Sequence, residues 1–381
     1  MDIENKEEKP VVLQIANDYF GTKLYKSLFN ALAEKDIRNI VFIPIKKGQG
    51  MKANSTASSE MEKLIVTPCF SQFDRLLFFS KQKKIISEIK KNVNMGEINL
   101  IHAHTLFSAG YSALKLKKEC GIPYITAVRN VDVNIFFEKI RFLRKTGIEI
   151  MREAAYIVFL SPAYRDTVLD NYVPSELRKS IETKCVVIPN GISPFFLENI
   201  YRNRKFDKGE IKLIYAGEIN RNKNLRETIA AMKRLEKEGY NLSFTAVGDI
   251  TDRRCSNILK DPLIKHIPRC GHEKLIEEYR KADIFVMPSI TETFGLVYAE
   301  AMSQGLPVIY TRGQGFDKQF KEGYVGFSVD SGRPDELAEN IKQIVDNYSA
   351  MSENCIKSCT RYSWSKIAEE YGGIYKRIKN E

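Results

Sequence analysis

The feature that most constrains the fold is an alternation of short, almost wholly apolar runs with longer amphipathic stretches. Runs such as VVLQIA at 11–16, NIVFIPI at 39–45 and AYIVFL at 155–160 contain few polar residues. Strands of this composition are covered on both faces, and helices between them form the parallel units of α/β proteins. The pattern occurs twice in 381 residues, so the sequence predicts two doubly wound domains in tandem.

A break in this pattern sets the predicted domain boundaries. Asn190-Gly191 and Pro194 are turn residues, and a charged stretch follows them. We therefore predict a first domain over residues 1–190, a linker over 191–210 and a second domain over 211–362. The predicted helices include Asn134–Glu153 in the first domain and Arg253–Leu259 in the second.

Charge and cysteine usage limit the class of protein. Lys and Arg number 59 against 48 Asp and Glu, so the net charge of +11 favours an anionic partner: nucleic acid, an acidic membrane surface or a phosphorylated substrate. Seven cysteines without a C-x-x-C pair argue against a disulfide framework and a structural zinc site. Residues 1–10 lack the pattern of a signal peptide, and no apolar run is long enough to span a bilayer. We expect a cytoplasmic protein.

The richest segment is PSITETFGLVYAEAMSQGLPVI at 288–309, in which a buried strand leads through a turn into a helix. Free N–H groups at such a helix start attract anions. Glu292 and Glu300 are eight residues apart, so both carboxylates lie on one side of the helix. The amides of Phe294, Gly295 and Leu296 could meet hydroxyls or a phosphate. Glu292 could then hold a sugar and Glu300 a ribose, although the spacing alone equally fits a helix-capping carboxylate and a surface glutamate.

This segment resembles the signature of the family-4 retaining glycosyltransferases. The matching residues are Glu292, Phe294, Gly295, Glu300, Ala301, Met302, Gly305, Pro307 and Val308. The resemblance is close from Ile211 to about Tyr324 and looser before that. It implies the GT-B fold, in which two Rossmann-like domains face each other across a cleft and a final helix, 363–381, crosses back to the first domain. It also implies a nucleoside-diphosphate sugar donor, retention of configuration, and no obligatory metal or other cofactor.

A second donor element runs from Tyr215 to Lys223, where Gly217 makes a tight turn before two cations. Arg221 and Lys223 could neutralise the diphosphate leaving group, or they could be ordinary surface cations. The family has arginine directly after the glycine and lysine five residues later. Lys223 matches the lysine, Glu218 replaces the arginine, and Arg221 is a candidate for the missing charge. Gly313–Phe316 is a weaker candidate for a contact with the sugar.

The first domain is expected to bind the acceptor. Asp18 and Gly21 lie in the first turn after a strand, and Gly21 would let the backbone approach a ligand or simply form a turn. His104 follows a strand at 99–103 and is placed on the acceptor side. With His102 it forms an H-x-H pattern, but no third ligand is evident, so we predict no metal site.

Arg129 follows the strand at 124–128, where the family often has histidine. Arginine cannot act as a general base, so its presence favours a mechanism in which the departing phosphate oxygen takes the acceptor proton. A strand-end salt bridge is the alternative. The predicted catalytic residues are Glu292, Lys223 and Arg129.

Basic stretches gather in the first domain. Phe136, Phe137, Ile140 and Phe142 are interleaved with one of them, Arg141, Arg144 and Lys145. This pattern favours contact with an anionic membrane, although solvated helix faces over buried aromatics would look the same. No motif supports nucleic-acid binding. We predict transfer of a sugar to a hydroxyl of a glycan or lipid-linked acceptor in cell-surface polysaccharide synthesis, in the cytoplasm or at the inner membrane face. A non-catalytic relative that binds a sugar nucleotide or a partner subunit, and a nucleotide-sugar epimerase, remain alternatives.

Overall fold

The computed structural model describes residues 9–48, 61–202, 204–207 and 209–380, which form two compact units. The first unit takes the chain up to Leu160, Arg165–Ile188 and the segment from Trp364 onward. The second takes Ser161–Tyr164 and Pro189–Ser363. Each unit is built on one parallel sheet flanked by helices, which confirms the predicted α/β fold class.

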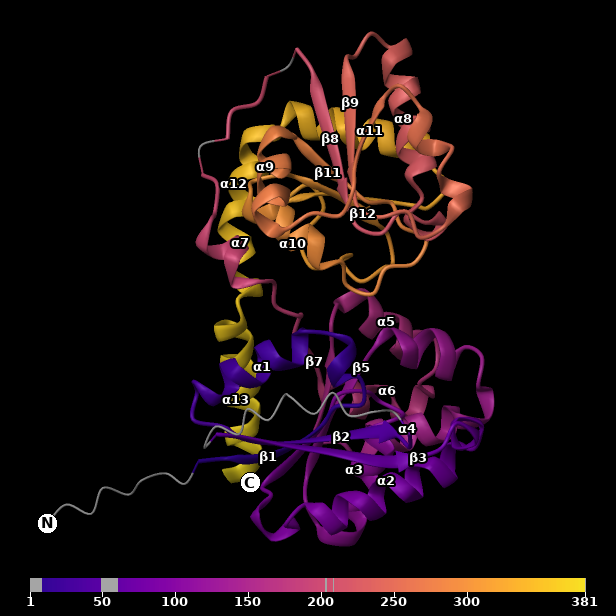
Figure 1. Cartoon of the computed structure of the whole chain (residues 1–381), viewed down its shortest axis with the longest axis vertical. Helices are drawn as coiled ribbons and strands as arrows, with labels where there is room; N and C mark the ends of the chain where they lie inside the picture. The colour runs from indigo at the N-terminus through magenta and orange to yellow at the C-terminus, as the bar shows by residue number, and fades with distance from the viewer. Residues whose placement is uncertain (1–8, 49–60, 203, 208, 381) are drawn as a thin grey trace, which may run out of the picture. The chain divides into compact units, whose positions relative to one another are not determined.

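The first unit has a seven-stranded sheet in the order β3-β2-β1-β4-β5-β6-β7, and all of its neighbouring strands are parallel (Figure 1). The strands are β1 (Val11–Ile15), β2 (Arg38–Lys46), β3 (Glu62–Phe70), β4 (Leu100–Ala103), β5 (Tyr124–Val128), β6 (Tyr156–Phe159) and β7 (Cys185–Val187). The strand order reverses between β1 and β4. In open α/β sheets, ligands bind at the carboxyl edge beside such a reversal.

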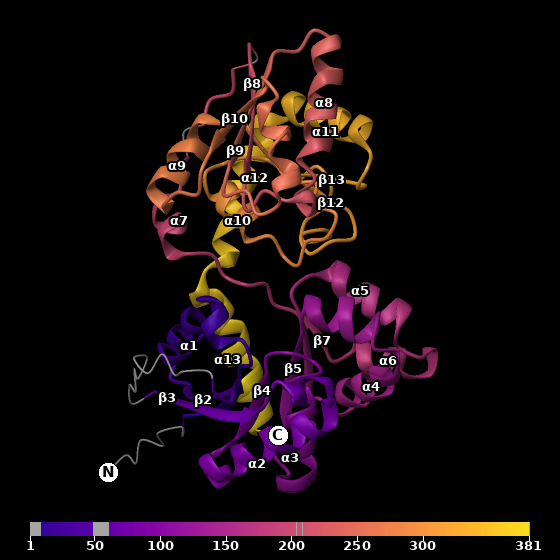
Figure 2. The same cartoon turned by 45° about the vertical axis from the view of Figure 1, so that its right-hand side comes forward.

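Helices cover both faces of this sheet. They are α1 (Leu24–Ala33), α2 (Phe78–Asn92), α3 (Gly110–Cys120), α4 (Arg144–Glu153), α5 (Pro162–Asn171), α6 (Ser175–Glu182) and α13 (Trp364–Asn380). α1 and α13 pack side by side on one face, while α2 and α3 lie together on the other (Figures 1 and 2). Trp364, Tyr371 and Tyr375 of α13 join Phe29 of α1 in the core. The last helix therefore returns to the first unit, as predicted.

The second unit repeats this topology in a six-stranded sheet with the order β10-β9-β8-β11-β12-β13. Its strands are β8 (Ile211–Ala216), β9 (Leu242–Val247), β10 (Ile264–Ile267), β11 (Ile284–Val286), β12 (Val308–Thr311) and β13 (Gly326–Val329). Its helices are α7 (Pro194–Glu198), α8 (Leu225–Lys237), α9 (His272–Lys281), α10 (Leu296–Ser303), α11 (Pro334–Asp346) and α12 (Tyr348–Cys359). α8 packs with α11, and α10 packs with α12 and α7. The order reverses between β8 and β11.

Two predicted helices differ from the structure. The single helix expected over Asn134–Glu153 is a π-helical turn at Asp132–Phe137, a 3-10 turn at Arg141–Leu143 and then α4. The amide of Ile140 bonds back five residues to the carbonyl of Ile135, which widens the helix before it breaks. The helix expected over Arg253–Leu259 is two 3-10 turns, Arg253–Cys255 and Ile258–Lys260.

Sequence analysis did not predict β3, β13, α6, α7 and α12. Among the described residues, no helix is both long and apolar enough to cross a membrane.

Candidate functional site

The loops that leave β8 and β11 meet at the carboxyl edge of the second sheet, where the strand order reverses. Asn222 holds them together: its Nδ2 donates to the carbonyl of Thr291 at 2.8 Å, and its Oδ1 accepts from the Thr291 amide at 3.0 Å. The amide of Ile290 donates to the carbonyl of Asn222 at 2.7 Å. The two predicted donor elements are therefore neighbours, joined by a residue that sequence analysis did not select.

Lys223 and Glu292 form an ion pair between these loops. Lys223 Nζ lies 2.6 Å from Glu292 Oε2, and their side chains are 19% and 12% exposed. Glu292 Oε1 accepts from the amide of Thr293 at 3.0 Å. Two residues predicted from separate motifs thus lie in direct contact, and their limited exposure shields the pair from solvent.

A further loop, after β12, supports Glu292 from its backbone side. Gln314 Oε1 accepts from the Glu292 amide at 2.9 Å, and the Gly315 amide donates to the Glu292 carbonyl at 3.0 Å. A Cβ at Gly315 would lie 1.9 Å from the carbonyl oxygen of Thr293, so only glycine fits there. Gly313–Phe316 gives only a weak signal in the sequence. In the structure it fixes the backbone around the central carboxylate.

Helix α10 begins beside this carboxylate. Gly295 takes a φ of +74° at the helix start, and a Cβ there would lie 2.4 Å from the ring of Tyr298. Leu296 is the first helical residue and is half-buried. The side chain of Phe294 is buried against the ring of Tyr362, with centroids 5.8 Å apart. Phe294 therefore anchors the turn with its ring, which leaves its backbone as the part able to meet a ligand.

The side chain of Glu300, on α10, is half-buried. Burial raises the pKa of its carboxyl to about 7. The buried hydroxyl of Tyr279, on α9, has no hydrogen-bond partner among the described residues. Burial raises the pKa of Tyr279, and the charge of Glu300 raises it further. A desolvated carboxyl and an unsatisfied phenol are both suited to a ligand that supplies hydroxyl groups. Sequence analysis did not select Tyr279.

The turn after β8 holds the remaining predicted donor residues. Gly217 has a φ of +149°, and a Cβ there would lie 2.8 Å from the hydroxyl oxygen of Tyr215. Arg221 is 62% exposed, and its Nε lies 3.1 Å from Asp252 Oδ2. Glu218 is exposed, and its carbonyl accepts from the Tyr215 hydroxyl at 2.8 Å. Arg221 thus lies on the same loop as Lys223, although an acidic partner engages it here.

In the first unit, the exits of β4 and β5 bring Arg129 and His104 together. Arg129 Nε donates to the carbonyl of His104 at 3.2 Å. The buried carboxylate of Asp132 accepts from the amides of Arg129, Leu106 and Phe107 at 2.9, 3.0 and 3.1 Å. Burial raises the pKa of Asp132 to about 6 despite these three bonds. Asp132, which was not predicted, ties the two strand exits to each other.

The side chain of His104 lies in the core rather than at the sheet edge. His104 and His102, here called the histidine pair, are both fully buried, with ring centroids 3.9 Å apart. His104 Nε2 bonds Gln14 Oε1 at 2.8 Å, and His102 Nδ1 bonds the Tyr375 hydroxyl at 2.7 Å. Burial holds the pKa of both imidazoles well below 6.5, so both are neutral at physiological pH. The contact of His104 with Arg129 is made through its backbone carbonyl.

Asp18 and Gly21 share the turn that follows β1. Asp18 is exposed, and its carbonyl accepts from the Gly21 amide at 3.1 Å. A Cβ at Gly21 would lie 2.3 Å from Asp18 Oδ1. The Asp18 carboxylate therefore lies over the turn at Gly21, and it would have to move to make room for a larger residue there. The described residues include no group of three or more His, Cys, Asp or Glu placed to hold a metal ion.

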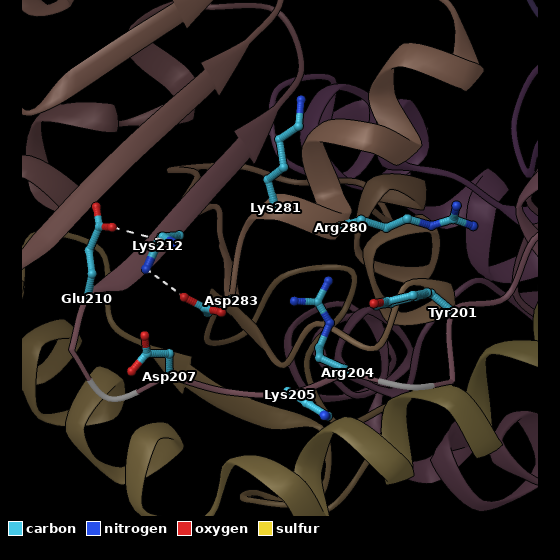
Figure 3. Close-up of a pocket in the computed structure, with 9 residues that line it drawn as sticks. All are labelled: Tyr201, Arg204, Lys205, Asp207, Glu210, Lys212, Arg280, Lys281 and Asp283. Carbon is cyan, nitrogen blue, oxygen red and sulfur yellow. Dashed lines mark hydrogen bonds and ion pairs between the residues drawn. The ribbon is translucent and has the colours of Figure 1, made fainter.

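A separate polar hollow of about 300 Å³ lies at the amino ends of β8 and β11, at the edge of the second sheet opposite to Lys223 and Glu292 (Figure 3). Its lining comprises Tyr201, Arg204, Lys205, Asp207, Glu210, Lys212, Arg280, Lys281 and Asp283. Arg204 donates to the carbonyls of Tyr279 and Gln304, at 2.8 and 2.9 Å, and to that of Ala282. It thereby neutralises the carboxyl ends of α9 and α10, which is a structural task.

Comparison with known proteins gives matches over most of the chain. The family model described as glycosyl transferases group 1 matches residues 198–361, and that described as glycosyltransferase family 4 matches 23–194. A D-inositol 3-phosphate glycosyltransferase of Paenarthrobacter aurescens is 24% identical over 93% of this chain and 92% of its own.

Solved structures share the fold. Sucrose-phosphate synthase from Thermosynechococcus elongatus is 18% identical with a TM-score of 0.73, and the match covers 97% of this chain and 99% of that one. Anabaena HepE, solved in complex with UDP-glucose, is 14% identical with a TM-score of 0.63, and the match covers 96% and 99% of the two chains.

Proposed function

Because this chain belongs to the family-4 glycosyltransferases of the GT-B fold, we propose that it transfers a sugar from a nucleoside diphosphate to an acceptor hydroxyl with retention of configuration. The observation that carries the proposal is the contact of Lys223 with Glu292 at the carboxyl edge of the second sheet. This contact holds a cation suited to the diphosphate and a carboxylate suited to the sugar in one place.

The pair divides the work of donor binding. On arrival of the donor, Lys223 exchanges its carboxylate partner for the diphosphate, whose charge grows as the glycosidic bond breaks. Glu292, released from the lysine, accepts hydrogen bonds from the sugar hydroxyls. Glu300 accepts from the two ribose hydroxyls, and Tyr279 is close enough to feel its charge. The amides of Gly295 and Leu296 complete the cradle at the start of α10.

The nucleotide part of the proposal has support from a solved relative. Anabaena HepE is solved with UDP-glucose, so its fold accepts a nucleotide sugar. We assign Gly217 to a close backbone approach to the diphosphate, and Arg221 to a second positive charge once it leaves Asp252.

Catalysis in this proposal needs neither a protein base nor a metal. Arg129 has no acceptor atom and keeps its proton, so the departing phosphate oxygen takes the proton of the acceptor hydroxyl on the face where the bond forms. Lys223 and Arg221 supply the positive charge that a divalent cation would otherwise give to the diphosphate. Activity that survives removal of metal by EDTA is the expected result.

We place the acceptor on the first unit, near Asp18, Gly21 and the carbonyl of His104. The acceptor class that we propose is a glycan or a lipid-linked saccharide used in cell-surface polysaccharide synthesis. To use a lipid-linked acceptor at the cytoplasmic face, the enzyme would make peripheral contact with an anionic membrane. The net charge of +11 supports an anionic surface or an anionic acceptor.

The first test is thermal stabilisation of the purified protein by a panel of nucleoside-diphosphate sugars. A ligand that binds only the native state raises Tm by an amount set by its concentration over Kd. One donor should raise Tm in the parent protein and fail to do so in Glu300→Ala. Glu292→Ala should retain the shift and lose turnover, and the anomeric configuration of the product is read by NMR. No shift with any donor, with or without acceptor, would favour a non-catalytic relative.

A further inference from the structure

Five large apolar side chains are exposed on two segments of the first unit. The exposed fractions are 82% for Phe73, 61% for Leu77, 48% for Phe79, 43% for Ile135 and 73% for Phe142. We call these five residues the apolar patch. Single exposed apolar residues are ordinary on soluble proteins, but a group of this size marks a surface that meets something apolar.

Ring contacts join the two segments that carry the apolar patch. Phe78, directly after Leu77, packs edge-on against Phe136, directly after Ile135, with ring centroids 6.0 Å apart. Phe78 and Phe79 both pack against Tyr111 of α3, at 5.6 and 5.5 Å. The start of α2 and the turn at Asp132–Phe137 therefore meet in one aromatic cluster, and residues of the apolar patch lie next to it in sequence on both segments.

Cations outnumber acidic residues in the segments that carry the apolar patch. Residues 73–84 and 138–145 contain two acidic residues, Asp74 and Glu138, against eight basic ones. The basic residues are Arg75, Lys81, Lys83, Lys84, Lys139, Arg141, Arg144 and Lys145. Asp74 is already neutralised, because its carboxylate lies 2.6 Å from Lys84 Nζ. Lys83, Lys139, Arg141 and Lys145 are exposed. Exposed aromatic side chains on segments with an excess of exposed cations are complementary to a bilayer with anionic headgroups.

The surface is mechanically connected to the edge of the sheet that carries Arg129. Asp132 opens the π-helical turn that presents Ile135, and its carboxylate holds the amides of Arg129 and Phe107. The turn that carries Ile135 is therefore held at a fixed position relative to the exits of β4 and β5.

From these observations we propose that the first unit docks on an anionic lipid bilayer through the apolar patch and the exposed cations of the same two segments. The aromatic side chains enter the boundary between headgroups and acyl chains, while the cations pair with lipid phosphates. A saccharide attached to a lipid then reaches the carboxyl edge of the first sheet without leaving the membrane. The docking assigns a surface to the membrane contact proposed above, and its last consequence rests on the proposed sugar transfer, whereas the docking itself requires no catalysis.

The test is co-sedimentation of the full chain with vesicles of phosphatidylcholine alone and of phosphatidylcholine with about one third phosphatidylglycerol. The parent protein should bind the anionic vesicles and lose binding as salt is raised. Phe73→Ser with Phe142→Ser should weaken binding about tenfold or more, because two large apolar side chains no longer enter the interface. Tyr324→Ser is the matched control, since Tyr324 is 41% exposed on the second unit and should bind like the parent.

The charge contribution is measured separately with Lys139→Ser, Arg141→Ser and Lys145→Ser combined. Each cation near an anionic surface contributes about a factor of five, so their joint loss should reduce binding about a hundredfold. All of these positions are exposed, so Tm should stay at the parent value.

Several outcomes would overturn the docking proposal. Equal binding to neutral and anionic vesicles would contradict it, and so would patch variants that bind like the parent. Absence of vesicle binding, together with a dimer that Phe73→Ser and Phe142→Ser dissociate, would assign the surface to a second copy of the chain. Donor turnover is assayed on the same samples with a soluble acceptor. Turnover without vesicle binding rejects the docking alone, and vesicle binding without turnover rejects the proposed function alone.

Discussion

Replacing Glu300 with glutamine should stabilise the protein at pH 8 and weaken its hold on the donor. Burial raises the pKa of this carboxyl from 4.5 to about 7. Such a shift corresponds to a cost of about 3 kcal/mol for keeping the ionised form in the folded state. The folded pKa lies above the unfolded one, so stability is lost as pH rises from about 4.5 to 7 and stays low above that. Glutamine has the same shape without the charge and avoids this cost.

The expected size of the effect depends on pH. At pH 8 the variant should gain up to about 3 kcal/mol, an upper limit because the side chain is only half-buried. For a unit of this size that is a rise in Tm of up to about 10 °C. At pH 5 the gain should fall to about 1 kcal/mol or less, because the unfolded carboxyl is then only partly ionised. Calorimetry at both pH values measures the difference.

Donor binding should move in the opposite direction. Glutamine offers one acceptor oxygen where the carboxylate offers two, so Kd for the donor should rise about tenfold or more at pH 8. Glu339→Gln is the control, because Glu339 is 56% exposed on α11 of the same unit and should change neither quantity measurably. A variant with the same Tm gain at both pH values, or with unchanged donor affinity, would refute the reasoning.

Three further predictions concern other parts of the structure. Asn222→Ala removes both side-chain hydrogen bonds to the loop that carries Glu292, so kcat/KM should fall about 10- to 100-fold with little change in Tm. Asn241→Ala, which changes an exposed amide of the same unit, should leave the kinetics unchanged. Equal kinetics for the two variants would show that catalysis does not need these hydrogen bonds. Gly315→Ala places a Cβ 1.9 Å from a backbone oxygen and should lower both Tm and turnover, unlike Gly373→Ala, whose added Cβ meets nothing within 4 Å; a fully active Gly315→Ala would contradict the tight packing. Burial lowers the folded pKa of the histidine pair below 6.5, so the contribution of the pair to stability is complete above pH 6.5 and is lost as pH falls below that value. Replacing both histidines with glutamine should flatten the profile of Tm against pH between pH 7 and 5. An unchanged slope would exclude the histidine pair as the source of the pH dependence.

The parts of the fold that sequence predicts are those with a strong local signal. The nearly continuous apolar runs are typical of buried parallel strands, and most strands of both sheets follow from them. β3 was not predicted because Glu62–Phe70 is an edge strand in which polar and apolar residues are mixed, and Lys63 and Pro68 are exposed. The break in the helix expected over 134–153 has no proline to announce it. Across the break, Arg144 Nε donates to the carbonyl of Phe137, and Asp132 before it bonds strand exits far away in sequence, and neither contact has a local sequence signal.

The candidate site divides in the same way. Glu292, Glu300 and Lys223 belong to motifs with fixed spacing, so the sequence alone is enough to select them. Asn222 and Gln314 act through hydrogen bonds to the loop at 290–292, and nothing in their local sequence indicates those partners. His104 is a case in which a local signal misleads. Its position at a strand end suggested exposure, but its side chain points to the same face as that of His102 and its ring lies in the core.

The return of α13 to the first unit has a consequence for the order in which the protein is made. Trp364, Tyr371 and Tyr375 belong to the core of the first unit, yet the ribosome reaches them only after residues 189–363. The second unit can therefore complete its own core during synthesis, while the first sheet still lacks the helix that packs against α1. Domains usually mature from the amino terminus onward, but here the later unit can finish first and the earlier one closes last. Until that moment, a nascent chain exposes an uncovered apolar surface to chaperones and to other chains.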